Sequence, residues 1–427
     1  MKITVMSAYF EPEITPYTHL IADLCRDWAS YGAEVTVITG MASRGLDEAT
    51  RQEYLNRTDE YLTPNIRVRR IGPKSKEPSQ LWARGLRYLY QTHVQYKTAR
   101  DTDTDVYFIG STPPFLGVLG TWLKKKAPTL YTLHDIFPDS LINTGRFKED
   151  SLIIRLGRRM EQFTYQQNSH IHTISEDFKE ILVSRGVPEN KISLVYNWID
   201  EQVVVPIEKK DNILISRYGI DPSKYIVTHC GNIGHSQNLE MVVDIAAELE
   251  KELPDLEFII IGDGGTKSDL ERYVQDKGAG NVRILPFQPY EDIAHVMSLG
   301  DVSLVCSKRN VGTSSFPSKT WSIMSAARPV ISSFDLNSEL CTIINRANSG
   351  LCSDAEDKQG LKNDLLTLYN DRPRAAELGQ NGRQYIEKNL TRKAATKQYY
   401  DIFTALVQAE GHQAAGRVAE HSKGISS

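Results

Sequence analysis

Short apolar segments alternate with longer amphipathic segments along the first half of the chain. The apolar segments are rich in β-branched and aromatic residues and cover residues 3–10, 34–40, 66–72, 105–111, 129–135, 169–175 and 193–197. Between the first two, apolar residues recur at helical spacing from Leu20 to Tyr31, and Gly32 follows as a stop signal. Strands that alternate with helices predict βα units, which form a parallel sheet with helices on its faces.

A polar stretch, residues 201–223, interrupts this alternation before it starts again. The second set of predicted strands covers residues 225–234, 256–265, 282–287, 302–307 and 329–334. We therefore expect two α/β domains, the first spanning residues 1–198 and the second residues 199–389. Apolar residues again recur at helical spacing between about 390 and 410, and the polar end, residues 411–427, is predicted to be a flexible tail.

The composition is that of an ordinary globular protein and argues against some classes of function. The 427 residues carry 50 Lys and Arg against 54 Asp and Glu, and the net charge of −4 argues against nucleic acid as a partner. The five cysteines are scattered without a CxxC pair, which indicates free thiols in a reducing compartment. No apolar run reaches the ~20 residues of a membrane span, so we expect a cytoplasmic protein, at most peripheral on the inner face of the plasma membrane.

Ligands of open parallel sheets bind beyond the carboxyl ends of the strands, so the loops after each strand are candidate binding sites. The loop after the first strand lacks GxGxxG, which argues against a nicotinamide-dependent dehydrogenase. In the second domain, GNIGHSQNLE (231–240), GDGG (262–265) and NVGTSSFPSK (310–319) offer glycines, hydroxyls and a lysine near helix starts. Such groups suit a phosphate, although the glycines equally fit plain turns and the serines equally fit helix caps.

An ordered set of segments is more specific than any one of these loops. It comprises YFEPE (9–13), YGAEVTVITG (31–40), STPPFLGVLG (111–120), LHDIFPDSLINTG (133–145), HTISEDFKEILVSRGVPENKISLVYNWID (172–200), GNIGHSQNLE (231–240), IIGDGG (260–265) and FPSKTWSIMSAARPVI (316–331). Together these segments resemble the GT-B-fold glycosyltransferases of the large retaining family 4. The resemblance covers about residues 1–405 and points to bacterial polysaccharide or O-antigen enzymes that use UDP-linked N-acetylamino sugars.

The resemblance implies an α/β protein of the GT-B class, with two Rossmann-like doubly wound domains that face each other across a cleft. The amino-terminal domain would bind the acceptor and the carboxy-terminal domain the nucleotide sugar, and the helix at about 390–410 would pack back on the first domain. No metal or cofactor is expected beside the UDP-sugar donor.

The resemblance also assigns roles to individual residues. The implied catalytic residues are His134 and Asp135, for which the alternative is a strand-end pair that makes only local hydrogen bonds. The acceptor side would comprise Glu13, Thr15 and Asp139. The implied donor-binding residues are Gly234, His235, Gly262, Gly264, Ser314, Ser318, Lys319, Ser322 and Glu339.

The chain departs from the family pattern at its acidic and basic donor residues. The family carries two glutamates around its PSK loop, and alignment through that loop places Ser314 and Ser322 at their positions, with Glu339 the nearest acid that could substitute. The usual arginine and lysine on the diphosphate correspond to Asn232 and Gln237. We predict a glycosyltransferase that moves an N-acetylamino sugar from a UDP donor to a glycan or polyprenyl-linked acceptor in cell-surface polysaccharide biosynthesis. The alternative is a non-catalytic GT-B subunit that binds a nucleotide sugar or a partner glycosyltransferase.

Two further charge patterns suggest a metal or a membrane. Asp101, Asp103 and Asp105 are spaced like metal-binding acids, but they precede a strand at the wrong sheet edge, so we expect a solvated turn and no metal. Residues 65–100 hold nine Lys and Arg against one Glu and place on one helical stripe Trp82, Leu86, Leu89, Tyr90 and Val94. This composition is typical of a helix that lies on an anionic membrane surface, where a polyprenyl-linked acceptor would be found. An ordinary domain helix with one solvent-exposed face has the same pattern.

Overall fold

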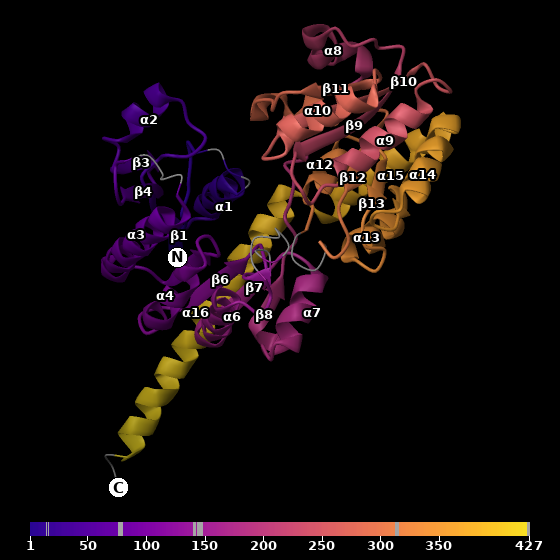
Figure 1. Cartoon of the computed structure of the whole chain (residues 1–427). Helices are drawn as coiled ribbons and strands as arrows, with labels where there is room; N and C mark the ends of the chain where they lie inside the picture. Colours follow the sequence, from indigo (N-terminus) through magenta and orange to yellow (C-terminus); the bar gives the residue numbers. More distant parts are fainter. Residues whose placement is uncertain are drawn as a thin grey trace. The chain divides into compact units, whose positions relative to one another are not determined.

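The computed structural model describes residues 1–424 except 14, 16, 76–79, 140, 141, 143–147 and 312–315 (Figure 1). The chain divides into two compact units. Unit 1 comprises Met1–Pro138, Glu149–Tyr196 and Lys393–Ser427, and unit 2 comprises Asp139–Lys148 and Asn197–Arg392. Within the described part of the chain, no helix is both long enough and apolar enough to cross a membrane.

Unit 1 is built on an eight-stranded sheet in the order β3-β4-β2-β1-β5-β6-β7-β8. Neighbouring strands are parallel except for the edge pair β3–β4, and Val5 of β1 lies opposite both Val37 of β2 and Phe108 of β5. The central strands β5 and β6 are buried along their whole length, which explains their continuous apolar sequences. The strands are β1 Lys2–Met6, β2 Glu34–Gly40, β3 Asp59–Thr63, β4 Ile66–Ile71, β5 Val106–Gly110, β6 Thr129–Leu133, β7 His170–Thr173 and β8 Ile192–Leu194.

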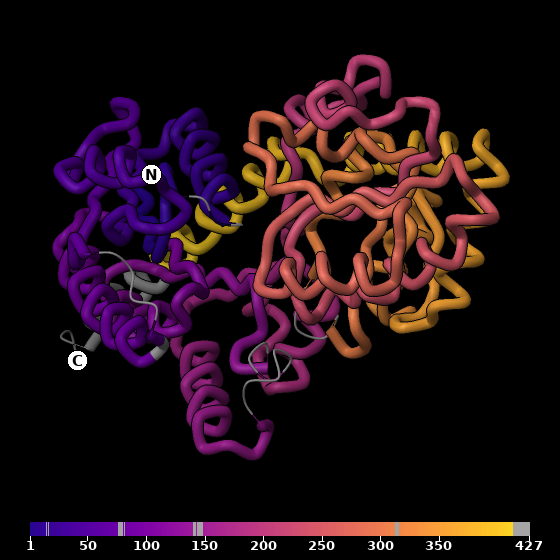
Figure 2. The backbone as a smooth tube through the Cα atoms, turned by 45° about the horizontal axis from the view of Figure 1, so that its top comes forward, coloured from indigo at the N-terminus to yellow at the C-terminus, as the bar shows by residue number. Residues whose placement is uncertain are grey.

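The terminal helix α16 (Arg392–Gly424) returns to unit 1 and lies beside its first helix and its sheet, as the yellow segment shows in Figures 1 and 2. Trp28, Phe108 and Phe403 meet edge to face there, with ring centroids 4.8–6.3 Å apart. The other unit 1 helices are α1 Thr18–Ser30, α2 Glu48–Tyr54, α3 Leu81–Asp101, α4 Phe115–Leu123, α6 Leu152–Gln167 and α7 Glu176–Ser184.

Helix α16 extends further than the terminal helix expected from the sequence. Residues 411–424, predicted to form a tail, continue the helix to Gly424. This stretch is polar, but alanine, glutamine, arginine and glutamate in it are good helix formers, so polarity alone was a poor guide to its backbone.

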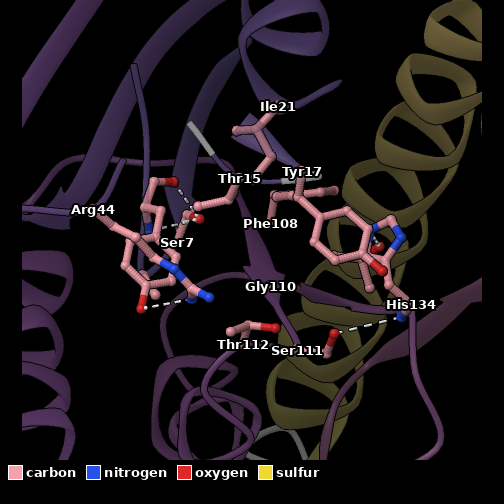
Figure 3. Close-up of a pocket in the computed structure, with 13 residues that line it drawn as sticks. Ser7, Thr15, Tyr17, Ile21, Arg44, Phe108, Gly110, Ser111, Thr112 and His134 are labelled. Carbon is pink, nitrogen blue, oxygen red and sulfur yellow. Dashed lines mark hydrogen bonds between the residues drawn. The ribbon is translucent and has the colours of Figure 1, made fainter. Parts of the chain in front are cut away.

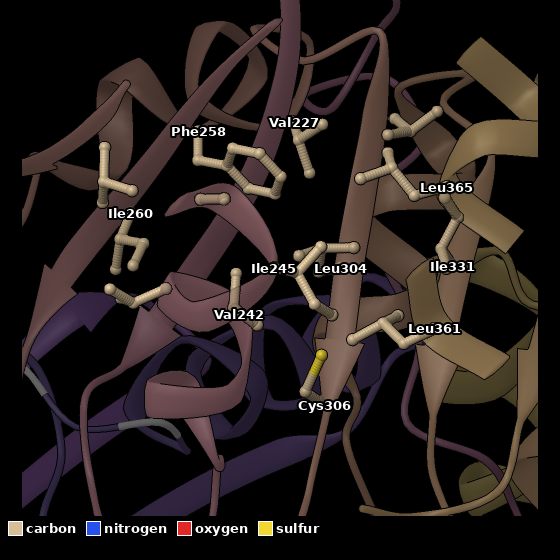
Figure 4. Packing of buried hydrophobic residues seen from close by; sticks show 14 of the residues in the cluster. Val227, Val242, Ile245, Phe258, Ile260, Leu304, Cys306, Ile331, Leu361 and Leu365 are labelled. Atoms are coloured by element: carbon tan, nitrogen blue, oxygen red, sulfur yellow. The ribbon is translucent and has the colours of Figure 1, made fainter. Parts of the chain in front are cut away.

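Unit 2 is built on a six-stranded, fully parallel sheet in the order β11-β10-β9-β12-β13-β14. One face of this sheet carries the apolar cluster drawn in Figure 4, in which Val242 and Ile245 of α9 and Leu361 and Leu365 of α14 pack on strand residues such as Phe258. The strands are β9 Tyr225–Asn232, β10 Leu256–Asp263, β11 Val282–Leu285, β12 Val302–Cys306, β13 Val330–Ser333 and β14 Gly350–Ser353. The helices are α8 Ile213–Tyr218, α9 Leu239–Leu249, α10 Lys267–Lys277, α11 Ile293–Met297, α12 Lys319–Ser325, α13 Glu339–Ala347, α14 Lys358–Asn370 and α15 Arg372–Asn389.

Candidate functional site

A pocket opens in unit 1 beside the carboxyl ends of β1, β5 and β6 (Figure 3). Its cavity volume is about 140 Å³. Tyr17 and His134 lie together on one side of it and Arg44 on the other. The residues that line the pocket are Ser7, Ala8, Tyr9, Thr15, Tyr17, Ile21, Arg44, Phe108, Gly110, Ser111, Thr112, Thr132 and His134. Of the residues expected on the acceptor side or in catalysis, this set includes Thr15 and His134.

His134 follows β6 directly, and its ring packs on that of Tyr17 with centroids 4.3 Å apart. Burial lowers the pKa of His134 to about 3, so the ring is neutral at physiological pH. Its Nε2 lies 3.2 Å from the Thr132 hydroxyl, whereas Nδ1 is buried and has no hydrogen-bond partner among the described residues. A buried nitrogen without a partner is uncommon in folded proteins, and in a residue of the pocket wall it is a candidate contact for a ligand hydroxyl once the wall shifts to admit one.

A buried chain of hydrogen bonds indicates which nitrogen of His134 carries the proton. Nε2 of His172 donates to the Val195 carbonyl at 2.9 Å, so Nδ1 of this neutral ring is an acceptor. Thr132 donates to that Nδ1 at 2.7 Å, and its oxygen is then free to accept from Nε2 of His134. Nδ1 of His134 is therefore the unprotonated nitrogen, which can accept a hydrogen bond. Tyr399 of α16 packs on His172 with its hydroxyl 2.8 Å from Nε2.

Asp135 is half-buried, and burial raises the pKa of its carboxyl to about 7. The group therefore exists in both protonation states near neutral pH, which suits a residue that takes up a proton during a reaction. A charge on Asp135 also contributes to the raised pKa of Tyr17. Asp139, which was expected on the acceptor side, is not among the residues that line the pocket and belongs to a segment of unit 2.

Glu13, which was expected on the acceptor side, supports the pocket wall and is not among the residues that line it. Its side chain is 3% exposed and accepts hydrogen bonds from the backbone N–H groups of Ser43 at 2.9 Å and Arg44 at 3.1 Å. Burial nevertheless raises the pKa of Glu13 to about 7. By holding this backbone, Glu13 positions the Arg44 side chain, whose guanidinium lies 5.4 Å from the centre of the Tyr9 ring.

Sequence reasoning did not identify Tyr9, Tyr17, Arg44, Thr132, His172 or Tyr399 as site residues. Arg44 follows β2, so the rule that ligands bind after strands contained the signal. Tyr399 carried no such signal, because a residue of the last helix reaches this site only through the return of the chain to unit 1.

In unit 2, Lys319 is the first residue of α12, close to the ends of β9 and β12. Its amine lies 3.4 Å from both ring nitrogens of His229, a buried ring whose pKa lies well below its ordinary value. Lys319 is half-buried, and burial lowers the pKa of its amine to about 8. No Asp or Glu among the described residues forms an ion pair with it. A partly protonated amine without a counterion, at the ligand-binding edge of the sheet, is suited to an anion.

Gly262, near the end of β10, and Gly264, just after it, allow close approach to the end of β9 and the residue that follows it. A Cβ atom on Gly262 would lie 1.8 Å from the Gly231 oxygen, and one on Gly264 would lie 2.1 Å from the Ile233 oxygen. Gly234 lies in a turn closed by a 3.2 Å hydrogen bond from Asn232 to Gln237, and His235 beside it is exposed. The glycines predicted to bind the donor thus have a packing role that the structure shows directly.

The remaining predicted donor residues lie around α12 and α13. Ser318 is exposed and makes no side-chain cap bond to α12, contrary to the capping alternative. Ser322 is half-buried one turn after Lys319, so the two share a helix face. Glu339 begins α13 and is buried. Ser314 falls outside the described residues.

The three acids suggested as a metal motif take part in local ion pairs or hydrogen bonds. The Lys2 amine lies 2.5 Å from Asp103, the Lys2 backbone N–H donates to Asp105 at 2.7 Å, and Arg100 contacts Asp101 at 2.9 Å. Among the residues described, no group of three or more His, Cys, Asp or Glu side chains is placed to hold a metal ion.

Each unit matches a family model over most of its length. Residues 18–203 match the model "Glycosyltransferase Family 4", and residues 211–385 match the model "Glycosyl transferases group 1". The chain belongs to the family 4 glycosyltransferases. The family identified from sequence motifs is therefore confirmed.

Relatives of this glycosyltransferase are distant in sequence. It is 24% identical over 282 residues to "Probable glycosyltransferase WbjE" of Pseudomonas aeruginosa, a match that covers 65% of this chain and 70% of the relative. It is 22% identical over 350 residues to alpha-monoglucosyldiacylglycerol synthase of Acholeplasma laidlawii, with 78% and 81% covered. The Anabaena protein HepE, solved with UDP and glucose, superposes with a TM-score of 0.71 at 16% identity over 95% of this chain and all of HepE. The predicted GT-B fold is confirmed.

Proposed function

We propose that this glycosyltransferase moves a sugar from a UDP donor to a glycan or lipid-linked acceptor. The observation that carries the proposal is Lys319, a half-buried amine at the carboxyl edge of the unit 2 sheet with no acidic partner among the described residues. A diphosphate would supply the negative charge that pairs with this amine. A charge-assisted hydrogen bond from Lys319 would also stabilise the diphosphate as the leaving group when its bond to the sugar breaks. The UDP seen with HepE supports a uridine donor.

The pocket in unit 1 is proposed to bind the acceptor. Nδ1 of His134 accepts a hydrogen bond from a sugar hydroxyl and orients it, while Asp135 is available as a proton acceptor because of its raised pKa. In the reaction, an acceptor oxygen bonds to the anomeric carbon, the bond from that carbon to the diphosphate breaks, and the hydroxyl proton leaves to Asp135 or to the departing phosphate oxygen. Transfer with retention and an N-acetylamino sugar as the transferred group rest on the sequence resemblance alone.

The donor class can be tested by equilibrium binding. We expect UDP and UDP-N-acetylamino sugars to raise the melting temperature of the purified protein, since a ligand that binds only the folded state stabilises it. ADP and GDP serve as controls that share the diphosphate but not the base. Equal stabilisation by UDP, ADP and GDP would show that the site recognises only the diphosphate and not the base. Absence of stabilisation by any of the three would contradict the proposal.

A non-catalytic subunit is the second candidate, and Ser322 favours it. The family's second glutamate, which holds the ribose, has a neutral hydroxyl in its place, and a neutral hydrogen bond contributes about 1 kcal/mol where a charged one contributes about 1.5–3 kcal/mol. Such a subunit would bind UDP-sugar but release no UDP with any acceptor. Enzymatic turnover therefore separates the two candidates.

A further inference from the structure

Three helices of unit 1 expose an unusual amount of apolar surface. Helix α4 packs against both α3 and α6, so the three form one layer. Trp82 on α3 is 69% exposed and Leu152 on α6 is 63% exposed. The large apolar side chains exposed on these helices are Trp82, Leu86, Leu89, Tyr90, Trp122, Leu152, Ile153, Leu156 and Phe163. We call these residues the apolar layer. Large apolar side chains exposed together on neighbouring helices are typical of an interaction site.

A groove runs into this layer between the three helices. Its cavity volume is about 600 Å³, within the range of pockets that hold small organic ligands. It is lined by Leu89 and Tyr96 of α3, Phe115 and Trp122 of α4, and Met160 of α6, among others. Tyr96 and Trp122 meet edge to face at 5.9 Å. Aromatic rings and a flexible methionine form a wall that suits a hydrocarbon chain.

Cationic side chains lie on the helices of the apolar layer. Helices α3, α4 and α6 carry seven Lys and Arg against two acids, Asp101 at the very end of α3 and Glu161. Arg87 is buried, Arg100 pairs with Asp101 and Arg158 pairs with Glu149, so these three arginines add little to the surface charge. Glu161 is buried and paired with Arg185 at 2.5 Å, so it does not offset charge at the surface. Arg155 and Arg159 are exposed on α6, and three consecutive lysines, 124–126, follow α4.

The exposed basic residues of unit 1 differ from those expected within residues 65–100. Arg67 and Arg70 belong to β4 and pair with Asp59 and Glu60 of β3, so they do not add to a surface for anions. Helix α6, which that expectation omitted, contributes three exposed aliphatic side chains, Leu152, Ile153 and Leu156. The sequence LIIRLGRRM at its start contained this signal, since apolar and basic residues alternate there without an acid.

We propose that the groove between α3, α4 and α6 binds a hydrocarbon chain of a membrane lipid, with the apolar layer resting on an anionic bilayer. The inference deepens the proposed function, since a lipid-linked acceptor lies in such a bilayer. Charge complementarity favours a bilayer over a second copy of the chain as the occupant. A two-fold contact would set each cationic layer against itself, whereas anionic headgroups neutralise it.

The tryptophans of the chain provide a direct probe. Of its five tryptophans, Trp82 and Trp122 are exposed on the apolar layer, and the other three, Trp28, Trp198 and Trp321, are buried. Vesicles of brominated phosphatidylcholine with one third phosphatidylglycerol should quench the fluorescence of the full-length protein. Replacing both exposed tryptophans by phenylalanine should remove the quenching while the protein still sediments with the vesicles. Quenching that survives this double substitution would contradict the proposed orientation.

Vesicle sedimentation then tests the surface itself. The double variant Leu152→Ser and Leu156→Ser should weaken binding to these vesicles by roughly tenfold or more, the scale of two lost aliphatic insertions. Arg155→Gln with Arg159→Gln should weaken it by roughly tenfold or more and reduce its sensitivity to salt. Phe287→Ser, which replaces an exposed apolar residue of unit 2, is the matched control and should bind as the wild type does.

Three outcomes would overturn the inference. The first is absence of vesicle binding at low salt, and the second is equal binding by the control and by both double variants. The third is concentration-dependent dimerisation in sedimentation velocity that the leucine variant abolishes, which would assign the layer to a second copy. None of these measurements involves the donor. Normal UDP binding beside a failed vesicle assay would therefore reject this inference and leave the proposed function standing.

Discussion

Replacing Lys319 with methionine should weaken UDP binding and stabilise the protein at the same time. Methionine keeps the length and flexibility of the side chain but removes its charge. Loss of a charge-assisted hydrogen bond to the diphosphate corresponds to about 1.5–3 kcal/mol, or roughly a 10- to 150-fold rise in the Kd of UDP. A lysine whose only role is structural would not combine these two effects.

The gain in stability follows from the pKa of the amine. The ordinary pKa of 10.5 falls to about 8 in the folded protein, so the unfolded chain binds more protons between these values and stability rises with pH across this window. Below pH 8 both states are protonated, and the full penalty of the buried charge is present. The shift is about 2.5 units and one unit corresponds to about 1.4 kcal/mol, so the penalty that methionine removes at pH 7 is at most about 3.5 kcal/mol.

Calorimetric titration with UDP and urea unfolding at pH 7 measure the two quantities. Lys251→Met, at an exposed lysine just before β10, is the matched control and should change neither. Wild-type affinity for UDP should also decline above about pH 8, as the amine loses its proton, whereas the affinity of the methionine variant should not. A Lys319→Met protein with unchanged UDP affinity, or one that is less stable than the wild type, would refute the reasoning.

Three further substitutions test the local structure. Glu13→Gln should flatten the pH dependence of thermal stability. Burial raises the pKa of Glu13 from 4.5 to about 7, so the wild type loses stability as pH rises through that interval. Melting temperatures of the wild type and the variant between pH 5 and 8 measure the difference. Thr132→Val should lower the free energy of unfolding by about 1–3 kcal/mol, and ¹⁵N NMR should show the Nε2–H form of His134 in the wild type and a mixture of tautomers in the variant. Gly264→Ala should unfold at clearly lower urea concentration, whereas Gly265→Ala should be nearly silent, since a Cβ there meets nothing within 4 Å; equal effects would contradict the close-approach argument.

The alternating pattern of apolar and amphipathic segments was enough to predict most of the fold. Strands such as β5 and β10 are buried along nearly their whole length, so they are continuous apolar runs in the sequence. The strands β3 and β14 were missed for want of an apolar run: β3, DEYLT, is largely exposed and polar, and β14, GLCS, is only four residues long and has no β-branched residue.

The candidate site was predictable only in part. His134 directly follows β6 and Lys319 begins α12, each at the carboxyl edge of a sheet. The rule that ligands of parallel sheets bind beyond the carboxyl ends of the strands made both residues candidates. The role of Glu13 could not be read from the sequence, because a buried acid that holds a loop and an exposed acid that binds a sugar look the same there. The hydrogen bonds between Thr132 and His172 depend on the pairing of β6 with β7, which only the fold establishes.

Transfer itself is the most direct test of the proposed function. The purified protein is incubated with a UDP-N-acetylamino sugar that carries a labelled sugar and with a bacterial lipid extract that contains polyprenyl-diphosphate oligosaccharides, and both released UDP and labelled lipid are measured. We predict that UDP and labelled lipid form in equal amounts, that neither forms without the extract, and that Lys319→Met strongly reduces both. Tight binding of the donor with no UDP released over a series of lipid and glycan acceptors would contradict the account and favour a non-catalytic subunit.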